Sequence, residues 1–578
     1  MNGSVPNKFE KCQGAMLATA IGDALGWPNE KNSKNISKKS ISSNSFIEWK
    51  RRCGRPYWHC EKIYAGEYSD DTQITLAIAR SIIAGDWEDS FANKELPFWL
   101  SYERGGGKAL RYAAKSYKAG NIVWKSAHKT EYFNAGGNGA VMRILPHVIS
   151  NAFSNDIKHL ISDVIKDSII THGHPRAILG ATCYAFALDY LLKKQSILEY
   201  GELVSAIIKS AELWTEYPNY EELSEWQKNA LVFSDYDYQR EWHNTSNKML
   251  KQLEYIKHTL DMALLIDDVS VLTKLECFGE ASGAGDVAIL AAVYLASKYA
   301  NNPVLGVTIP ASSYGIDTDT IASITGGLLG MLCGTSWIPF EWQSVQDYDC
   351  ILKVTELLLA DNKKESAKSF VSCVKEKEKS WKHTPIGSLK AIDSIVLANG
   401  KTSNIIEVKW QSTLGQTIYI KENQVNTNNS SLNNDNYEPV NKYENENKSQ
   451  NKTASNSAEF QLSLTNQDII QLKNEPMLKA KTFGTILKII ELLLKKPQDI
   501  DYISKKLKVD KKIVDLLSKY INDILTSFLL YSAADKKNDS TDMIETIISY
   551  INEHFKEDLP DKVLASAAGL SSYHFIRV

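Results

Sequence analysis

Two short stretches of this sequence place carboxylates and hydroxyls together at the start of an apolar segment. The first is Ser69-Asp70-Asp71-Thr72, and the second is Asp317-Thr318-Asp319-Thr320, shortly after Gly315. Apolar and small residues follow each stretch, so each is predicted to begin a buried helix. A carboxylate at a helix start usually only caps the helix, and capping is the alternative for either stretch taken alone.

The repetition of this pattern favours metal binding over capping. Adjacent carboxylates such as Asp70 and Asp71 repel each other at one helix start unless a cation lies between them. Carboxylate and hydroxyl oxygens are also the hard ligands that divalent cations prefer. Two chemically similar stretches therefore predict one shared metal centre, with each helix N-terminus offering oxygens to it.

Glycines form a third candidate site. The segment Gly136-Gly137-Asn138-Gly139 bares backbone N–H groups just before a predicted helix. Such a segment can cradle an anion and would suit a diphosphate, although it could equally be a tight turn. The run Gly105-Gly106-Gly107-Lys108 is not a phosphate-binding P-loop, because the spacing and the Ser or Thr after the lysine are missing.

Further polar residues lie at predicted helix ends. Residues 8 to 26 predict a helix rich in small residues, which another helix can approach closely. Within it, Asp23 is expected to be a buried, hydrogen-bonded structural carboxylate. Glu30 follows Pro28, where a loop can aim it into a cleft. His172 starts another predicted helix, and a lone histidine of this kind is usually structural.

Composition narrows the class of protein. The chain has 578 residues, enough for two or more domains, and a formal net charge of −3, which argues for neither nucleic acid nor membrane as a partner of the whole chain. No apolar run is long enough to span a bilayer, and the first ten residues lack a signal-peptide pattern. We expect a cytoplasmic protein. The eight cysteines form no Cys-x-x-Cys pair and are expected to be reduced, mostly buried thiols.

The chain is predicted to have several parts. Helical patterns with few strands predict an all-α domain over residues 8–380, in which residues 31–60 form a surface loop. Residues 381–422 form a small β-containing extension with a hairpin about Gly415. Residues 423–458 are polar and predicted to be a disordered linker. Residues 480–535 predict helix-turn-helix-like helices or, equally, a helical oligomerisation module, and residues 543–578 predict a further helix-turn-helix.

These residues together resemble the ADP-ribosylglycohydrolase family, which includes the dinitrogenase-reductase activating glycohydrolase. The resemblance covers residues 8 to about 375, and its blocks occur in the family's order. They are Gly22–Gly26 with Glu30, Ser69–Thr72, Gly137–Ala140 with Met142-Arg143, Thr171-His172 and Gly315–Thr320. The last residues, 543–578, resemble the first half of an AraC-type DNA-binding domain.

The resemblance implies an all-α fold with two Mg²⁺ or Mn²⁺ ions. The implied metal ligands are Ser69, Asp70, Asp71, Asp317, Asp319 and Thr320, and the implied catalytic residues are Glu30, Asp71 and Asp317. Substrate contacts are implied for Gly136, Gly137, Asn138, Gly139, His172, Tyr314 and Gly315. The chain has Ser69 where many members have threonine, and Ile316 where many have a smaller residue, which could reshape the pocket.

The implied activity is hydrolysis of the ribose C1″ glycosidic bond of an ADP-ribosylated protein, nucleic acid or small molecule. The alternative is a non-catalytic ADP-ribose sensor that regulates transcription, with DNA bound through the C-terminal helices. Retention of every expected carboxylate favours the hydrolase. The group attached to ADP-ribose, whether arginine, serine, a base or an acetyl ester, is left open by the residues.

Residues 423–458 yield a first testable prediction, because almost no large apolar side chains occur there. Limited proteolysis is expected to cleave within this segment, and a fragment that ends near residue 422 is expected to keep full hydrolase activity. Mass spectrometry of the digest and an activity assay of the fragment are the measurements. Loss of activity would mean that residues beyond the linker belong to the catalytic unit.

Overall fold

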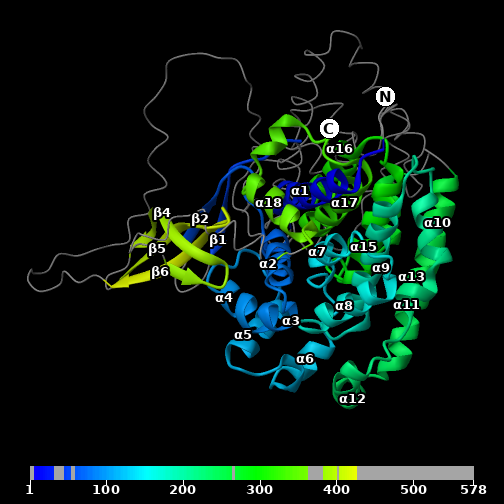
Figure 1. Ribbon diagram of the computed structural model, residues 1–578, viewed down its shortest axis with the longest axis horizontal. Coiled ribbons are helices and arrows are strands. Elements are labelled where there is room, and N and C mark those ends of the chain that lie inside the picture. The colour runs from blue at the N-terminus through cyan, green and yellow to red at the C-terminus, as the bar shows by residue number, and fades with distance from the viewer. Residues whose placement is uncertain are drawn as a thin grey trace, which may run out of the picture. The chain divides into compact units, whose positions relative to one another are not determined.

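The computed structural model describes residues 5–30, 44–53, 59–262, 267–361, 363, 382–399 and 403–425. Over these ranges the chain is mostly helical, with two small antiparallel sheets (Figure 1). The predicted segments 480–535 and 543–578, and the linker from residue 426 onward, lie outside the described residues.

The helical part of the chain consists of α-helices joined by loops and by short 3₁₀ or π-helical segments. The α-helices of the first half are α1 (Lys8–Gly26), α2 (Asp70–Ala84), α3 (Trp87–Asp89), α4 (Leu96–Trp99), α5 (Lys108–Lys118), α6 (Lys129–Phe133), α7 (Leu145–Ser150), α8 (Ile157–Ile169), α9 (Pro175–Lys193), α10 (Glu202–Lys209), α11 (Ala211–Thr215) and α12 (Ser224–Phe233). Those of the second half are α13 (Tyr238–Asp261), α14 (Asp268–Lys274), α15 (Gly285–Lys298), α16 (Pro303–Ser312), α17 (Thr318–Cys333) and α18 (Tyr348–Leu359). The short turns include the 3₁₀ segments η1 (Trp27–Asn29) and η4 (Val141–Arg143) and the π-helical η2 (Ser90–Glu95).

Helices α1 and α17 pack backbone against backbone, although their residues are about 300 positions apart in the sequence. A Cβ added to Gly22 would lie 2.2 Å from the carbonyl oxygen of Ala322, and one added to Gly330 would lie 2.2 Å from that of Gly14. The Thr318 hydroxyl also donates a hydrogen bond of 2.8 Å to the Gly26 carbonyl. The small residues therefore hold the start of α17 against the end of α1, as the sequence predicted for the first helix.

The rest of the helical core forms around this pair. Helix α17 also packs against α15 and α16, and α9 packs against α8 and α15. Helices α9 and α15 are buried along most of their length, which agrees with their nearly continuous apolar sequences. This arrangement fixes the N-termini of α2, α9, α15 and α17 relative to one another, and these are the helix ends that carry the predicted site residues.

A small hairpin replaces part of the predicted surface loop over residues 31–60. Strand β1 (Trp49–Cys53) pairs with β2 (His59–Ile63) in antiparallel register. The Trp49 side chain is only 2% exposed and packs edge-on against Trp27, with 5.1 Å between ring centroids. The sequence prediction was wrong here because the polar residues around this segment hide the apolar anchor that buries it.

The C-terminal part of the described chain is a sheet of four strands in sequence order. Its strands are β3 (Lys382–Thr384), β4 (Gly387–Asn399), β5 (Ser403–Ser412) and β6 (Thr417–Val425), each antiparallel to its neighbour. The predicted hairpin about Gly415 corresponds to β5 and β6, but two further strands extend it. Strand β6 also passes the predicted boundary at residue 422, so a fragment for the activity assay should end after Val425. The sequence predicted this β-containing extension, but the hairpin β1–β2 lies inside residues 8–380, so the predicted all-α fold is corrected to mostly helical with a small sheet.

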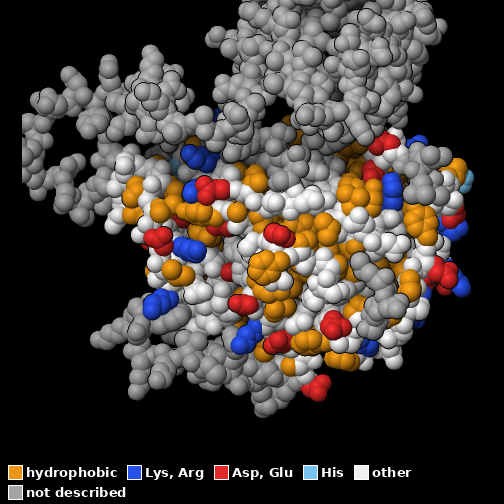
Figure 2. Space-filling view, turned by 90° about the horizontal axis from the view of Figure 1, so that it is seen from above, with side chains coloured by type: hydrophobic (Ala, Val, Ile, Leu, Met, Phe, Trp, Pro, Cys, Tyr) orange, Lys and Arg blue, Asp and Glu red, His pale blue; other side chains and the backbone are white. Residues whose placement is uncertain are grey.

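Two further features concern possible membrane contact and the distribution of surface charge. Within the described ranges, no helix is both long and apolar enough to cross a bilayer. Figure 2 shows Asp, Glu, Lys and Arg side chains interspersed with apolar and uncharged ones on the face seen from above.

The close approach of α1 and α17 predicts the effect of Gly22→Ala. Alanine favours a helix by roughly 0.5–1 kcal/mol over glycine, but its methyl group would overlap the Ala322 carbonyl. We expect a net loss of about 1–3 kcal/mol and a lower unfolding temperature, measured by thermal denaturation. The control is Gly279→Ala, whose added Cβ would meet nothing within 4 Å. Equal unfolding temperatures for the two variants would contradict this packing.

Candidate functional site

The N-terminus of α2 is held by a carboxylate from α1. Asp23 is fully buried and accepts hydrogen bonds from the Ser69 amide at 2.9 Å, the Thr72 amide at 3.0 Å and the Thr72 hydroxyl at 2.6 Å. The Ser69 hydroxyl accepts a further bond of 3.3 Å from the Asp71 amide. Since Asp23 satisfies the free amides of the first turn, the side chains of Asp70 and Asp71 are not needed as caps.

The N-terminus of α17 carries the second set of predicted ligands. Asp317 precedes the helix, and its side chain does not cap it. Its Oδ2 instead accepts a hydrogen bond of 2.9 Å from Nδ2 of the Asn138 side chain. Asp319 accepts from the Thr320 amide at 2.9 Å. The Thr320 hydroxyl lies 3.4 Å from Asp71 Oδ1, so the starts of α2 and α17 meet at this point.

Burial and mutual repulsion dominate the electrostatics of these carboxylates. Burial, then the charges of Asp23, Asp70 and Asp317, raises the pKa of Asp71 well above its usual range. The pKa of Asp319 is raised in the same way by burial, then by the charges of Glu30, Asp317 and Asp71. Burial also raises the pKa of Asp70 well above its usual range, with repulsion from the nearby carboxylates added. A cation among these groups would relieve the repulsion.

The donor chemistry at this point fits a hard divalent cation. Within the described residues, Asp71 Oδ2 is a buried carboxylate oxygen with no hydrogen-bond partner, which is an unusual state for a buried acceptor. Carboxylate and hydroxyl oxygens from α2 and α17 surround the same region. Within the described ranges no three His, Cys, Asp or Glu side chains lie close enough to hold a metal ion, so the fit concerns the kind of donor atoms present and not a formed ligand set.

Glu30 and a glycine loop lie at the edge of this acidic group. Glu30 follows η1, and its charge contributes to the raised pKa of Asp70 and Asp319, which places it near both helix starts. On another side, a Cβ added to Gly105 would lie 2.7 Å from Asp70 Oδ1. Glu103, two residues earlier, is the largest charge contribution to the pKa of Asp70. The sequence alone does not indicate Glu103 and Gly105 as site residues, because only the fold brings residues 103–105 next to Asp70.

The glycine segment before η4 lies against the start of α15 and next to Asp317. The Asn138 amide donates to the Gly283 carbonyl at 3.0 Å, and the Gly285 amide donates to the Gly136 carbonyl at 3.0 Å. Gly283 itself is next to Asp317, since an added Cβ would lie 3.3 Å from Asp317 Oδ2. The amides of Gly136 and Asn138 donate to backbone carbonyls, so the predicted anion cradle is smaller than the sequence indicated.

The His172 ring packs against this glycine segment. A Cβ added to Gly139 would lie 2.9 Å from His172 Cε1, so only glycine fits there. Burial, then the nearby charge of Arg143, lowers the pKa of His172 to about 3, and the ring is neutral at physiological pH. Arg143 donates a hydrogen bond of 2.6 Å to the Gly139 carbonyl and pairs with Asp167 at 2.7 Å.

The two remaining predicted substrate contacts lie between α16 and α17. The Tyr314 side chain is 80% exposed, and Gly315 adopts a φ of +100°, a conformation that other residues rarely take. Ile316 is buried in the hydrophobic core, and its effect on the shape of the pocket stays a prediction. The structure thus brings the carboxylates, Thr320 and the glycine segment together, with Tyr314 exposed beside them in the chain.

Comparison with known proteins shows which family this chain belongs to. The family model described as ADP-ribosylglycohydrolase matches residues 4–368. The chain belongs to this family. Members of the family generally depend on divalent metals, in keeping with the carboxylates gathered at α2 and α17.

Two named proteins are similar to this chain over part of its length. An ADP-ribosylarginine hydrolase Tri1 of Serratia proteamaculans is 25% identical over 197 residues, covering 32% of this chain and 49% of the relative. The ADP-ribosyl-[dinitrogen reductase] glycohydrolase of Rhodospirillum rubrum is 29% identical over 174 residues, covering 29% and 54%. The chain thus spans about half the length of these two relatives. A solved structure described as an ADP-ribosylglycohydrolase-related protein complex is 18% identical with a TM-score of 0.39, covering 62% of this chain and 99% of that one.

The unpaired carboxylate oxygen leads to a prediction for Asp71→Asn. Removing one buried negative charge relieves repulsion, so the metal-free variant is expected to unfold at a higher temperature than the metal-free wild type. The control is Asp167→Asn, which breaks a buried ion pair with Arg143 and should cost roughly 3–5 kcal/mol. Thermal denaturation in the presence of a chelator measures both. A lower unfolding temperature for Asp71→Asn would mean that Asp71 is an ordinary structural carboxylate.

Proposed function

We propose that this family member is a metal-dependent hydrolase that cleaves the ribose C1″ glycosidic bond of an ADP-ribosylated substrate and releases ADP-ribose. The observation that carries the proposal is the meeting of carboxylates at the starts of α2 and α17, where Asp71 has a buried oxygen with no hydrogen-bond partner in the described part of the chain. The family match over residues 4–368 supports the same activity.

The proposed ligands of two Mg²⁺ or Mn²⁺ ions are Ser69, Asp70, Asp71, Asp317, Asp319 and Thr320. When bound, these cations would hold the ribose hydroxyls and a water molecule on one face of the sugar. The chain's own contribution is to hold the oxygens in place. Asp23 fixes the first turn of α2, and Asn138 holds one oxygen of Asp317.

The proposed role of Glu30 is to position and deprotonate the attacking water. Cleavage of the glycosidic bond develops positive oxocarbenium character at C1″, and a nearby carboxylate can accept the proton of the water as it attacks. Glu30 suits this role because it lies near Asp70 and Asp319 but outside both helices. Asp71 and Asp317 contribute as ligands that face the same reaction centre.

The proposed contacts to ADP-ribose come from the glycine segment and the loop before α17. Amides of Gly137 and Gly139 can donate to the diphosphate, with the neutral His172 ring supporting them from behind. Gly136 and Asn138 shape the segment through their bonds to the residues before α15. Tyr314 offers an exposed aromatic ring beside Gly315 for an adenine base to stack on.

The proposed substrate class is an ADP-ribosylated protein, with arginine as the first linkage to test. The names of two relatives, an ADP-ribosylarginine hydrolase and a glycohydrolase of ADP-ribosyl-dinitrogen reductase, support this order of testing. Conjugates of serine, nucleic acid bases and acetyl esters complete the screen. The alternative of an ADP-ribose sensor depends on the segments 480–535 and 543–578, which lie outside the described residues.

Two substitutions separate metal binding from proton transfer. Asp317→Asn keeps the size of the side chain but removes a ligand charge, so it should weaken metal affinity and reduce turnover by orders of magnitude. Glu30→Gln should leave metal affinity nearly unchanged and still reduce turnover by roughly 10²–10⁴-fold, the usual contribution of a general base. Calorimetric titration with Mn²⁺ and an assay of ADP-ribose release measure the two effects.

Each variant has an outcome that contradicts its assignment. Normal hydrolysis by Asp317→Asn at low metal concentration would contradict the proposed metal centre. Wild-type activity of Glu30→Gln would mean that another group is the base, and the aspartates proposed as metal ligands would be tested next. Absence of ADP-ribose release from every conjugate by the wild-type protein would contradict the proposed hydrolase itself.

A further inference from the structure

The C-terminal sheet begins after the residues that define the family. The family model ends at residue 368, whereas β3 begins at Lys382. The sheet nevertheless contacts the helical body. Arg80 of α2 donates to Gln416, and the Thr417 amide donates to Asp347 at 2.9 Å. These contacts raise the question of what the added sheet does for the site.

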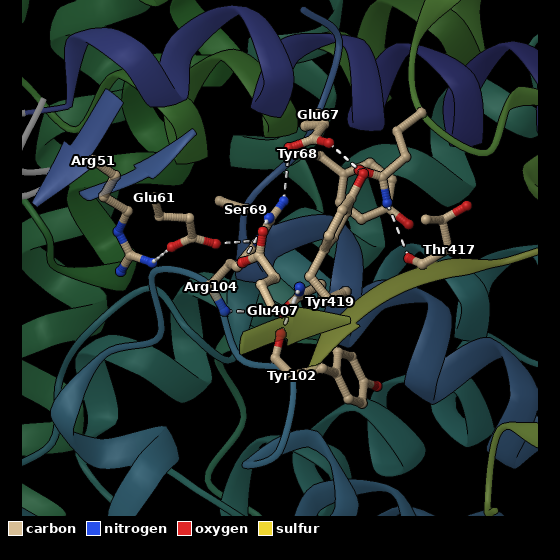
Figure 3. Close-up of polar contacts among 12 residues, drawn as sticks. Arg51, Glu61, Glu67, Tyr68, Ser69, Tyr102, Arg104, Glu407, Thr417 and Tyr419 are labelled. Atoms are coloured by element: carbon tan, nitrogen blue, oxygen red, sulfur yellow. Dashed lines mark hydrogen bonds and ion pairs between the residues drawn. The ribbon is translucent and has the colours of Figure 1, made fainter. Parts of the chain in front are cut away.

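Arg104 is the centre of the contact between the sheet and the helical body (Figure 3). Its guanidinium is 2% exposed and pairs with Glu61 of β2 at 2.7 Å and with Glu67 at 2.7 Å. On the side of the sheet, Glu407 of β5 lies 3.6 Å away, and the ring of Tyr419 of β6 lies 3.8 Å from the guanidinium carbon. A buried arginine of this kind is stable only while these partners stay in place.

The sheet also binds the two carboxylates that hold Arg104. The Tyr419 hydroxyl donates to Glu67 Oε1, the oxygen that Arg104 does not use. Lys421 lies 2.8 Å from Glu61 Oε2, again the other oxygen. Glu61 and Glu67 therefore each bind both Arg104 and strand β6. Arg104, these two carboxylates and β6 together form one connected unit.

Charge effects agree with this sharing. Burial would raise the pKa of Glu61, but Arg104, Lys421 and Arg51 outweigh it and hold that pKa well below its usual range. Burial raises the pKa of Glu407 to about 7, against the pull of Arg104. Glu407 lies 3.6 Å from Arg104, farther than Glu61 and Glu67 at 2.7 Å, so Tyr419 and Lys421 of β6 make the closer connection to the site through those two carboxylates.

Two connections run from this unit to the metal-ligating residues. Glu67 lies two residues before Ser69, the N-cap of α2. Arg104 precedes Gly105, whose φ of +106° brings its backbone against Asp70, as the 2.7 Å distance from an added Cβ to Asp70 Oδ1 shows. The Arg104 amide also donates to Gln73 Oε1 of α2 at 3.3 Å. Movement of Arg104 would therefore reach Asp70 from both sides.

We propose that the C-terminal sheet is part of the catalytic unit and that Arg104 is a positioning residue, which sets the Asp70 carboxylate through Gly105 while β6 holds Arg104 and Glu67 in place. The inference rests on the proposed function, since Asp70 is taken as a ligand of that site. A cavity of about 370 Å³ between the sheet and the body, lined by Glu67, Asp347 and Tyr419 among others, leaves part of this contact open to solvent and therefore dependent on the direct bonds.

The test compares two neighbouring positions on β6 in the full chain. Tyr419→Phe removes the hydroxyl that holds Glu67 but keeps the ring over Arg104. Ile418→Ala is the matched control, because Ile418 is buried in the hydrophobic core and makes none of the contacts to Arg104 or Glu67 described above. Both variants should lower the unfolding temperature. Lys421→Gln, which removes the cation beside Glu61 Oε2, is a second variant with the same expected outcome for the case in which Tyr419→Phe does not fold.

Three measurements separate positioning from stability. Tyr419→Phe is expected to bind Mn²⁺ about tenfold more weakly in calorimetry, the order found when a group supporting a metal ligand is removed. Its kcat should fall at saturating substrate with little change in KM. Amide hydrogen exchange of a peptide over residues 102–107 should be faster than in the wild type, without metal or substrate present. Ile418→Ala should match the wild type in all three well below its unfolding temperature.

Two results would overturn the inference. One is Mn²⁺ affinity and exchange of residues 102–107 in Tyr419→Phe within twofold of the wild type. The other is an equal change in Tyr419→Phe and Ile418→Ala, which would give the sheet a purely stabilising role. Failure of the proposed function looks different, because the wild type would then release no ADP-ribose while the exchange difference between the two variants would persist.

Discussion

Repulsion between buried carboxylates is the constraint on which the rest of the structure depends. Asp70, Asp71 and Asp319 are buried at helix starts and Asp23 is buried near the end of α1, and burial raises the pKa of each. Such a cluster costs folding free energy unless hydrogen bonds or cations compensate it. Asp23 obtains its compensation from the amides of α2, whereas Asp71 keeps an oxygen without a partner among the described residues. A bound cation would relieve this electrostatic cost, so the repulsion that destabilises the metal-free fold favours cation binding.

The helical packing serves to hold these charges at a fixed separation. Gly22 and Gly330 let α1 and α17 touch through their backbones, so that Asp23 near the end of one helix and Asp317 at the start of the other both lie near Asp71. A larger side chain at these glycines would push the two helix ends apart. The same residues that make the core compact therefore also set the geometry of the site.

The C-terminal sheet, which lies beyond the residues matched by the family model, also helps to hold charged side chains in place. Arg104, Glu61 and Glu67 form buried ion pairs whose second oxygens are bound by Tyr419 and Lys421. A buried charge network of this kind contributes little net stability but demands one arrangement of its members. That property suits a contact next to a site in which the position of Asp70 has to be reproducible.

The sequence by itself determined the mostly helical class, the two acidic helix starts and the close packing of the first helix, because hydroxyls, carboxylates and small residues at those spacings act locally. It did not determine which helix meets which, since Asp71 and Thr320 are neighbours only through the fold. Nor did it show Glu103 and Gly105 beside Asp70, or the hairpin at Trp49, because long-range contacts leave no periodic pattern in a polar segment. The pairing of Arg104 with β6 likewise joins residues more than 300 positions apart, and only tertiary structure decides such a contact.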